Sequence, residues 1–210
     1  MRYSKIVGLG HHVPETVITN EYLSTLMDTN NEWIVERTGI QERRWIDPAK
    51  DTVANMAAKA SRMALRRAGL VEKDIDFIVF ATITPDYFFP GSGVLLQREL
   101  GLDGKIAAMD IRNACSGFIY ALSVADQFIK TGMYKNILVV GAEKHSFGLD
   151  FTTRGRNISV IFGDGAGAVV LQPAGASSSS GILSTHLHSD GEAAEILAMY
   201  NPGTHANHWV

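Results

Sequence analysis

The sequence predicts an α/β fold in which helices cover a mixed, mostly parallel β-sheet. Two apolar runs, FIVFA at 77–81 and NILVVG at 136–141, are typical of strands that are buried on both faces. Apolar residues recur at helical spacing between 53 and 68, and strands alternate with helices as far as residue 141. This alternation indicates parallel pairing through right-handed crossovers. With 46% hydrophobic and 20% charged residues, the 210-residue chain has enough apolar material for a core.

Local signals define the elements of the first part of the chain. We expect a strand at 5–9, a short helix at 20–27, a helix from Asn30 or Asn31 to Gly39, and a helix between Thr52 and Gly69. Asparagine is a preferred N-cap residue, and glycine commonly ends a helix because it adopts the left-handed conformation. The helix expected from Asn30 or Asn31 to Gly39 therefore has both a capping asparagine at its start and a glycine at its end.

The alternation continues in the middle of the chain and then changes. We expect strands at 77–81, 106–111 and 136–141, helices at 92–100 and 115–131, a polar loop at 142–157, and two further strands at 158–162 and 166–171. The segment PAGASSSSG has the composition of a linker. We therefore predict an N-terminal domain at 1–172, a linker at 173–181, and the start of an incomplete second domain at 182–210, with a strand beginning at 182–188.

Charge and composition exclude several classes of function. The net charge of −3 gives no reason to expect nucleic acid or an anionic membrane as a partner. No stretch approaches the ~20 consecutive apolar residues that a membrane span requires. The N-terminus lacks the long apolar region of a secretory signal, and one cysteine forms no internal disulfide. We therefore expect a cytoplasmic protein.

Cys115, the only cysteine, lies between a predicted strand and the start of a predicted helix. A lone cysteine is commonly a small buried core residue. The backbone amides and dipole at a helix N-terminus, however, favour a thiolate, which is a nucleophile suited to taking an acyl group. The small neighbours Ala114, Ser116 and Gly117 leave room for a substrate. Local features alone leave both interpretations open.

The glycine and histidine motifs give weaker signals. Gly8 and Gly10 lack the third glycine of a dinucleotide fingerprint, and the glycines of 163–167 precede a strand rather than a helix, so we interpret both groups as tight turns. His186 and His188 would share a strand face, but no further ligand pattern lies nearby, so we expect structural histidines and no metal site. His205 and His208 receive no role.

Trp33 and Arg37 lie four residues apart on one predicted helix and therefore share a face. A surface stack of arginine on tryptophan is common and has no necessary function. The functional interpretation is a platform for a flat, anionic ligand such as a nucleotide. Arg154 and Arg156, in the predicted polar loop, are candidates for further cations.

Five segments together resemble the β-ketoacyl-acyl carrier protein synthase III family, thiolase-fold enzymes that start bacterial fatty-acid synthesis. They are DTNNEWIVERTGIQER (28–43), ACSGFIYALSVADQFIKTG (114–132), VVGAE (139–143), IFGDGAGAVVL (161–171) and GILSTHLHSDG (181–191). They span almost the whole chain in the family's order. The resemblance implies a thiolase-like layered fold, with the first half and the start of the second half present.

The resemblance also implies roles for particular residues. Cys115 matches the nucleophile that takes an acyl group from acyl-coenzyme A (acyl-CoA). Trp33 and Arg154 match the pair that sandwiches the adenine, Thr29 matches a polar contact to it, and Arg37 matches a phosphate contact.

Further matches concern the acyl pocket. Phe89 matches an aromatic residue that closes the pocket of a homodimer partner, and Phe162 and Leu197 match pocket-lining residues. His145 falls where relatives often have an aliphatic residue, which leaves the primer chain length open. The family's catalytic histidine and two asparagines belong to second-domain motifs that are absent from these 210 residues.

The implied reaction has two stages and uses no permanently bound cofactor. Cys115 takes an acyl group from acyl-CoA, and malonyl-acyl carrier protein then loses carbon dioxide and condenses with the acyl-cysteine. We expect that the 210 residues alone do not condense, because the missing side chains stabilise the developing charge. The alternatives are a condensing enzyme of secondary metabolism, of the alkylquinolone or long-chain ketone type, and a non-catalytic acyl-CoA-binding subunit.

Overall fold

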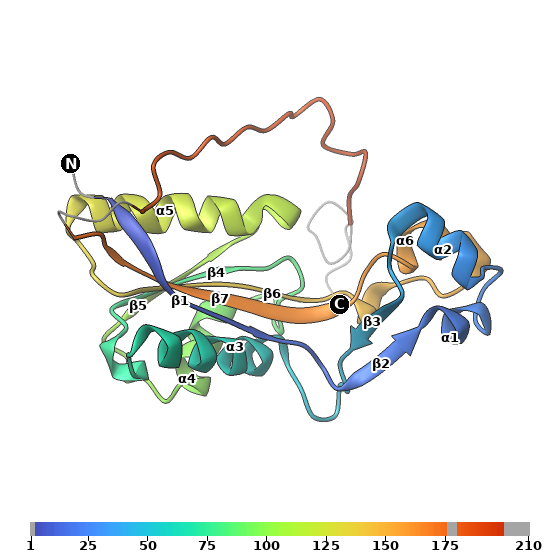
Figure 1. Cartoon of the computed structure of the whole chain (residues 1–210), viewed down its shortest axis with the longest axis horizontal. Helices are drawn as coiled ribbons and strands as arrows, with labels where there is room; N and C mark the ends of the chain where they lie inside the picture. The colour runs from blue at the N-terminus through green and yellow to red at the C-terminus, as the bar shows by residue number, and fades with distance from the viewer. Residues whose placement is uncertain (1–2, 176–179, 200–210) are drawn as a thin grey trace.

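A five-stranded sheet organises the chain, with helices on both of its faces (Figure 1). The computed structural model describes residues 3–175 and 180–199. The strand order is β1 (Ser4–His12), β7 (Asp164–Pro173), β6 (Ile137–Lys144), β4 (Phe77–Ala81) and β5 (Ala107–Ile111). Helices α3 (Val53–Ala68) and α4 (Ser92–Glu99) lie on one face, and α5 (Gly117–Thr131) lies on the other. This arrangement is the predicted α/β layering.

The sheet is mixed, as predicted. β4 pairs in parallel with both β5 and β6, whereas β7 is antiparallel to β6 and to β1. In the described chain, four strands therefore run in one direction and β7 runs in the opposite direction. Because β4, β5 and β6 are parallel, their carboxyl ends lie at the same end of the sheet.

A small lobe lies at one end of the sheet (Figure 1). It contains β2 (Thr16–Thr19), α1 (Asn20–Ser24), α2 (Asn31–Thr38), β3 (Glu42–Trp45) and α6 (Arg156–Ser159). β2 and β3 form an antiparallel pair. The buried core of the lobe consists of Ile18, Leu23, Met27, Ile34 and Val160. Val160 follows α6, so this core joins the start of the chain to the segment before β7.

The predicted helix caps are confirmed. The Asn30 side chain accepts a hydrogen bond of 2.8 Å from the Trp33 backbone N–H, and Gly39 ends α2 with a φ of 71°. In the same way Thr52 caps the start of α3, and Gly69 ends α3 with a φ of 69°. These local interactions fix where α2 and α3 begin and end.

The interpretation of Gly8 and Gly10 as a tight turn was wrong, because both lie inside β1. A Cβ atom at Gly8 would lie 2.1 Å from the Ala64 carbonyl oxygen, and one at Gly10 would lie 2.1 Å from that of Ala60. The glycines therefore allow α3 to pack directly on the β1 backbone. Gly165 and Gly167 likewise lie inside β7 rather than in a turn.

Two predicted strands are absent from the structure. The segment 158–162 contains the end of α6 and a turn, and its Val160 packs in the small lobe rather than in the sheet, while Ile158 is exposed. The segment 182–188 has no strand pairing and instead passes beside α5 (Figure 1). There the Ser123 and Thr185 hydroxyls lie 2.9 Å apart, and the Tyr120 hydroxyl donates to the His188 carbonyl over 3.2 Å.

The predicted polar loop at 142–157 is also more ordered than expected, since β6 continues to Lys144 and short helical turns follow. The predicted boundaries of domain and linker stay predictions. Two parts of these segments lie outside the described residues: 176–179 in the predicted linker, and 200–210 in the predicted second domain, which include His205 and His208.

Candidate active site

Cys115 lies where the sequence predicts it, between the end of β5 and the start of α5. It occupies a helical turn, Ala114–Ser116, and α5 begins two residues later at Gly117. The preceding residue, Ala114, has a φ of 47°, a left-handed conformation that is uncommon for a residue with a side chain. Cys115 is exposed rather than buried in the core. The structure therefore favours the interpretation of Cys115 as an accessible nucleophile.

A pocket of about 160 Å³ adjoins Cys115. Its lining comes from the start of α5 and from residues at or just after the ends of β4 and β6: Ala81, Ile83, Ala114, Cys115, Phe118, Gly141, Ala142, Glu143 and His145. The carboxyl ends of parallel strands are where α/β proteins usually bind ligands. A second, almost wholly apolar pocket of about 420 Å³ shares Phe118 and Gly141 with the first. The thiol thus lies beside apolar space suited to an acyl chain.

Glu143 is a polar residue of the pocket for which the sequence analysis predicted no role. Its carboxylate accepts hydrogen bonds from the Ile83 backbone N–H at 3.0 Å and from the hydroxyls of Thr84 at 2.6 Å and Thr82 at 3.3 Å. His145 Nε2 lies 4.0 Å from the same carboxylate. Glu143 therefore fixes the segment after β4 against the end of β6, at the wall of the pocket.

The structure brings His145 and Phe162 together. Their ring centroids are 4.6 Å apart, and His145 lines the Cys115 pocket. Asp164, buried at the start of β7, accepts hydrogen bonds from the Ser146 backbone N–H at 2.9 Å and from its hydroxyl at 2.6 Å. It also accepts one from the Ile46 backbone N–H at 2.7 Å. Asp164 thus positions the loop that carries His145, a role visible only once the loops are placed together.

Two arginines lie over Trp33 on α2, the residue for which a nucleotide platform was predicted. The guanidinium carbons of Arg37 and Arg156 each lie 4.6 Å from the centroid of the Trp33 ring. Thr29 Oγ1 is buried and has no hydrogen-bond partner among the described residues. Trp33 and Arg37 thus contact each other on α2, and their role toward a nucleotide stays a prediction.

Arg154 is placed differently from Arg156. Its Nε donates to Asp150 Oδ2 at 2.8 Å, and its Nη2 lies 2.8 Å from the same oxygen. Hydrogen bonds from the Thr152 hydroxyl and backbone N–H, followed by that of Arg154, lower the pKa of Asp150 to about 2. The side chain of Arg154 is 89% exposed. Of the two arginines at 154 and 156, Arg156 contacts Trp33 in this structure.

Phe89 and Leu197 lie away from the Cys115 pocket. Phe89 is 80% exposed, in a loop with the exposed side chains of Tyr87 and Phe88, and Leu197 is 72% exposed. Neither residue lines either of the two pockets beside Cys115. An exposed group of three aromatic side chains is typical of a surface that contacts another molecule.

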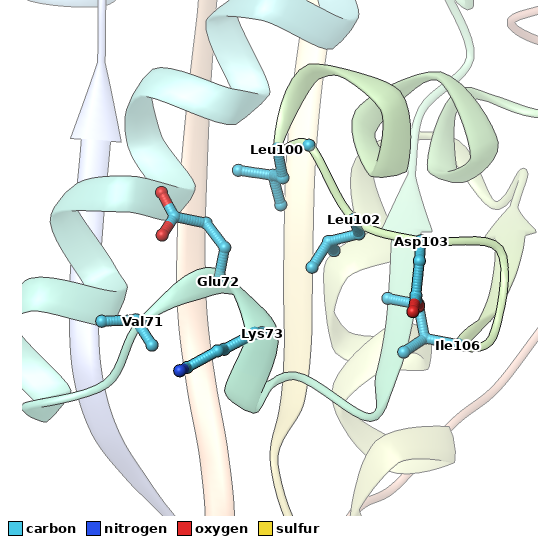
Figure 2. Close-up of a pocket in the computed structure, with 8 residues that line it drawn as sticks. Val71, Glu72, Lys73, Leu100, Leu102, Asp103 and Ile106 are labelled. Carbon is cyan, nitrogen blue, oxygen red and sulfur yellow. The ribbon is translucent and has the colours of Figure 1, made fainter.

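A larger pocket, of about 620 Å³, lies at the opposite end of the sheet (Figure 2). Figure 2 shows Val71, Glu72 and Lys73 on one side of it, and Leu100, Leu102, Asp103 and Ile106 on the other. These segments precede β4 and β5, so the pocket adjoins the amino ends of strands whose carboxyl ends adjoin Cys115. It contains no cysteine and is remote from the candidate nucleophile.

Other classes of site find little support in residues 3–175 and 180–199. No group of three or more histidine, cysteine, aspartate or glutamate side chains there is arranged to hold a metal ion. His186 Nε2 instead lies 3.1 Å from the Ser184 hydroxyl. In the same residues, no helix has the length and apolar character needed to cross a membrane.

Comparison with known proteins gives consistent results. Residues 109–191 match the sequence model of the family described as 3-oxoacyl-[acyl-carrier-protein (ACP)] synthase III, another name for the β-ketoacyl enzyme. The chain is 47% identical over 203 residues to a β-ketoacyl-[acyl-carrier-protein] synthase III of Methylococcus capsulatus, covering 97% of this chain and 61% of that protein. The chain spans about three fifths of the length of the curated relatives it matches.

Two solved structures extend the comparison to the fold. The 3-oxoacyl-[acyl-carrier-protein] synthase III of Aquifex aeolicus is 47% identical, with a TM-score of 0.77 over 81% of this chain and 54% of that one. The enzyme of the same name from Pseudomonas aeruginosa is 34% identical, with a TM-score of 0.85 over 94% and 60% of the two chains. The resemblance found in the sequence thus extends to the layered thiolase-like fold. The chain belongs to the β-ketoacyl-acyl carrier protein synthase III family.

Proposed function

We propose that the protein starts fatty-acid synthesis by condensing an acyl-CoA primer with malonyl-acyl carrier protein. The observation that carries the proposal is the placement of the only cysteine, exposed beside apolar space at the carboxyl ends of β4 and β6. Relatives that are 47% identical bear the name of this activity. The proposal needs acyl-CoA and malonyl-acyl carrier protein as partners and no permanently bound cofactor.

In the first stage, the Cys115 thiolate attacks the carbonyl carbon of the acyl-CoA thioester. The carbon–sulfur bond to coenzyme A breaks, coenzyme A leaves as a thiolate that takes up a proton, and Cys115 keeps the acyl group as a thioester. The two adjoining pockets provide apolar surface for the acyl chain next to the thiol. We assign the pocket wall to Phe162 and His145, and the nucleotide end of coenzyme A to Thr29, Trp33, Arg37 and Arg154.

In the second stage, malonyl-acyl carrier protein loses carbon dioxide, and the resulting carbanion attacks the acyl-cysteine. The products are a β-ketoacyl-acyl carrier protein and free Cys115. Stabilising the carbanion requires donors around the thioester oxygen. The resemblance assigns this work to a histidine and two asparagines in motifs outside the 210 residues. We therefore propose that the 210 residues accept the acyl group on Cys115, and that condensation also needs the motifs that carry the histidine and the asparagines.

We also propose a homodimer that brings Phe89 to the acyl pocket of the partner subunit. Two features support self-association. The loop with Tyr87, Phe88 and Phe89 exposes three aromatic rings, and β5 forms an edge of the described sheet. Edge strands and exposed apolar patches both favour pairing with another chain. We also propose a cytoplasmic location for the protein.

Acyl transfer from acetyl-CoA to Cys115 tests the proposed function. Intact-protein mass spectrometry should show the mass increase of one acetyl group for the wild type and no change for Cys115→Ala. Adding malonyl-acyl carrier protein tests condensation separately from acylation. An unmodified wild type, or an acetyl adduct that persists in Cys115→Ala, would end the assignment.

A further inference from the structure

Trp33 is contacted by two arginines that come from different parts of the chain. Arg37 lies one helical turn after Trp33 on α2, whereas Arg156 begins α6. Each guanidinium carbon is 4.6 Å from the centroid of the indole ring. This distance is within the range of a cation–π interaction. The ring that would stack on a purine is therefore already covered by two planar cations.

Arg156 is held more firmly than Arg37. Its Nη1 donates a 2.7 Å hydrogen bond to the Asp28 carbonyl, and its side chain is 31% exposed. The Asp28 backbone N–H in turn donates to Thr153 Oγ1 at 3.1 Å, so two hydrogen bonds tie the loop before α2 to the segment before α6. Arg37 makes longer hydrogen bonds of 3.3 Å, to the Trp33 carbonyl and to Glu36, and is 49% exposed.

Because Arg156 is held more firmly than Arg37, we expect the two arginines to have different roles. A ligand that stacks on Trp33 at the place of Arg37 breaks the cation–π contact of Arg37 and its two hydrogen bonds of 3.3 Å, whereas displacing Arg156 would break an equal cation–π contact and a shorter hydrogen bond of 2.7 Å. The released Arg37 is then free to reach a phosphate group, whereas Arg156 keeps its bond to Asp28. Arg154, two residues earlier, is instead directed to Asp150.

We propose that Arg156 is a positioning residue for the nucleotide end of acyl-CoA. It holds the Trp33 ring and the loop before α2 in place. This inference rests on the proposed function, because it takes coenzyme A as the ligand. A planar guanidinium suits this role, since it stacks on an aromatic face while donating hydrogen bonds in its own plane. The resemblance to the family assigns no such role to Arg156.

Direct binding of coenzyme A tests the proposal. Titration calorimetry should give a Kd that rises about five- to twentyfold in Arg156→Gln relative to the wild type, as loss of a cation–π contact predicts. Arg98→Gln is the matched control, since Arg98 is an exposed arginine on α4 that pairs with the adjacent Glu99. Its Kd should equal that of the wild type. An unchanged Kd in Arg156→Gln would overturn the proposal.

A second measurement separates positioning of the nucleotide from damage to the fold. Acetyl-phosphopantetheine carries the same thioester without the nucleotide, so Arg156→Gln should raise the KM for acetyl-CoA in Cys115 acylation while leaving that for acetyl-phosphopantetheine unchanged. An equal loss with both donors would overturn the proposal. If the wild type binds coenzyme A but Cys115 takes no acyl group, the proposed function fails while the Kd comparison still decides the role of Arg156.

Discussion

The Glu143 carboxylate accepts a 2.6 Å hydrogen bond from the Thr84 hydroxyl at the wall of the pocket that holds Cys115. Thr84 is buried, and its hydroxyl in turn accepts a hydrogen bond of 2.7 Å from the Lys144 backbone N–H. The segment after β4 and the end of β6 are thus joined by hydrogen bonds in both directions. One carboxylate therefore maintains the shape of the pocket wall.

Replacing Glu143 by glutamine should destabilise the protein. The amide group offers donors where the carboxylate accepts from Ile83, Thr82 and Thr84, so at least one of these donors loses its partner. We expect the free energy of unfolding to fall by about 1–3 kcal/mol, measured by urea denaturation. Glu195→Gln, at an exposed position, is the control and should have no effect. Equal stability of the two variants would contradict this account of Glu143.

Substituting alanine for Gly10 should separate α3 from β1. The added Cβ would lie 2.1 Å from the Ala60 carbonyl oxygen, a backbone atom that moves only with the helix. We expect a loss of about 2–3 kcal/mol in unfolding free energy, measured by thermal or urea unfolding. Gly104→Ala meets no atom within 4 Å and should be neutral or slightly stabilising. A stable Gly10→Ala variant would show that α3 does not need this close approach.

The conformation of Ala114 predicts an order of stability among its variants. At a φ of 47°, glycine is unstrained and a β-branched residue is strongly disfavoured. Ala114→Gly should therefore be at least as stable as the wild type, and Ala114→Val should lose about 1–3 kcal/mol, compared by their melting temperatures. Ala107→Val, in strand β5, serves as the control because valine suits an extended backbone. The reverse order at position 114 would contradict the left-handed turn before Cys115.

His12 should make stability depend on pH. Burial, followed by the nearby charge of Lys59, lowers the pKa of His12 from its ordinary value of 6.5. Its Nε2 is buried and has no hydrogen-bond partner among the described residues. Because folding favours the neutral ring, this contribution is fully present above the unfolded pKa of 6.5 and is lost as the pH falls through the lower folded pKa.

An NMR titration of the His12 ring tests this expectation. The midpoint should lie below 6.5, and the decline of unfolding free energy between neutral and mildly acidic pH should be shallower in His12→Gln. A midpoint at or above 6.5 would show that the ring is not held in its neutral form.

The parts of the fold that the sequence predicted are those set by neighbouring residues. Asn30 and Gly39 mark the ends of α2 because capping is a contact between residues a few positions apart. The buried strand at 77–81 was evident from its continuous apolar run. Gly8 and Gly10 were misinterpreted because their reason lies in α3, about fifty residues further along the chain, which a local pattern does not contain.

The candidate site shows the same division. The position of Cys115 between a strand and a helix followed from the periodicity of the apolar residues. Its role as the acyl-accepting nucleophile was predicted from the resemblance of the segment 114–132 to the family. The sequence identified Arg154 and Arg156 as cations but not their directions, which depend on Asp150 and Asp28. Glu143 and Asp164 were missed because their partners, Thr84 and Ser146, meet them only when the loops after the strands come together.

Locating the acetyl group after exposure of the wild-type protein to acetyl-CoA tests the central claim most directly. Tandem mass spectrometry of a proteolytic digest should find the acetyl group on the peptide that contains Cys115, and hydroxylamine, which cleaves thioesters, should remove it. An acetyl group found on another residue, or a Cys115 peptide that stays unmodified, would contradict the assignment of Cys115 as the acyl-accepting nucleophile.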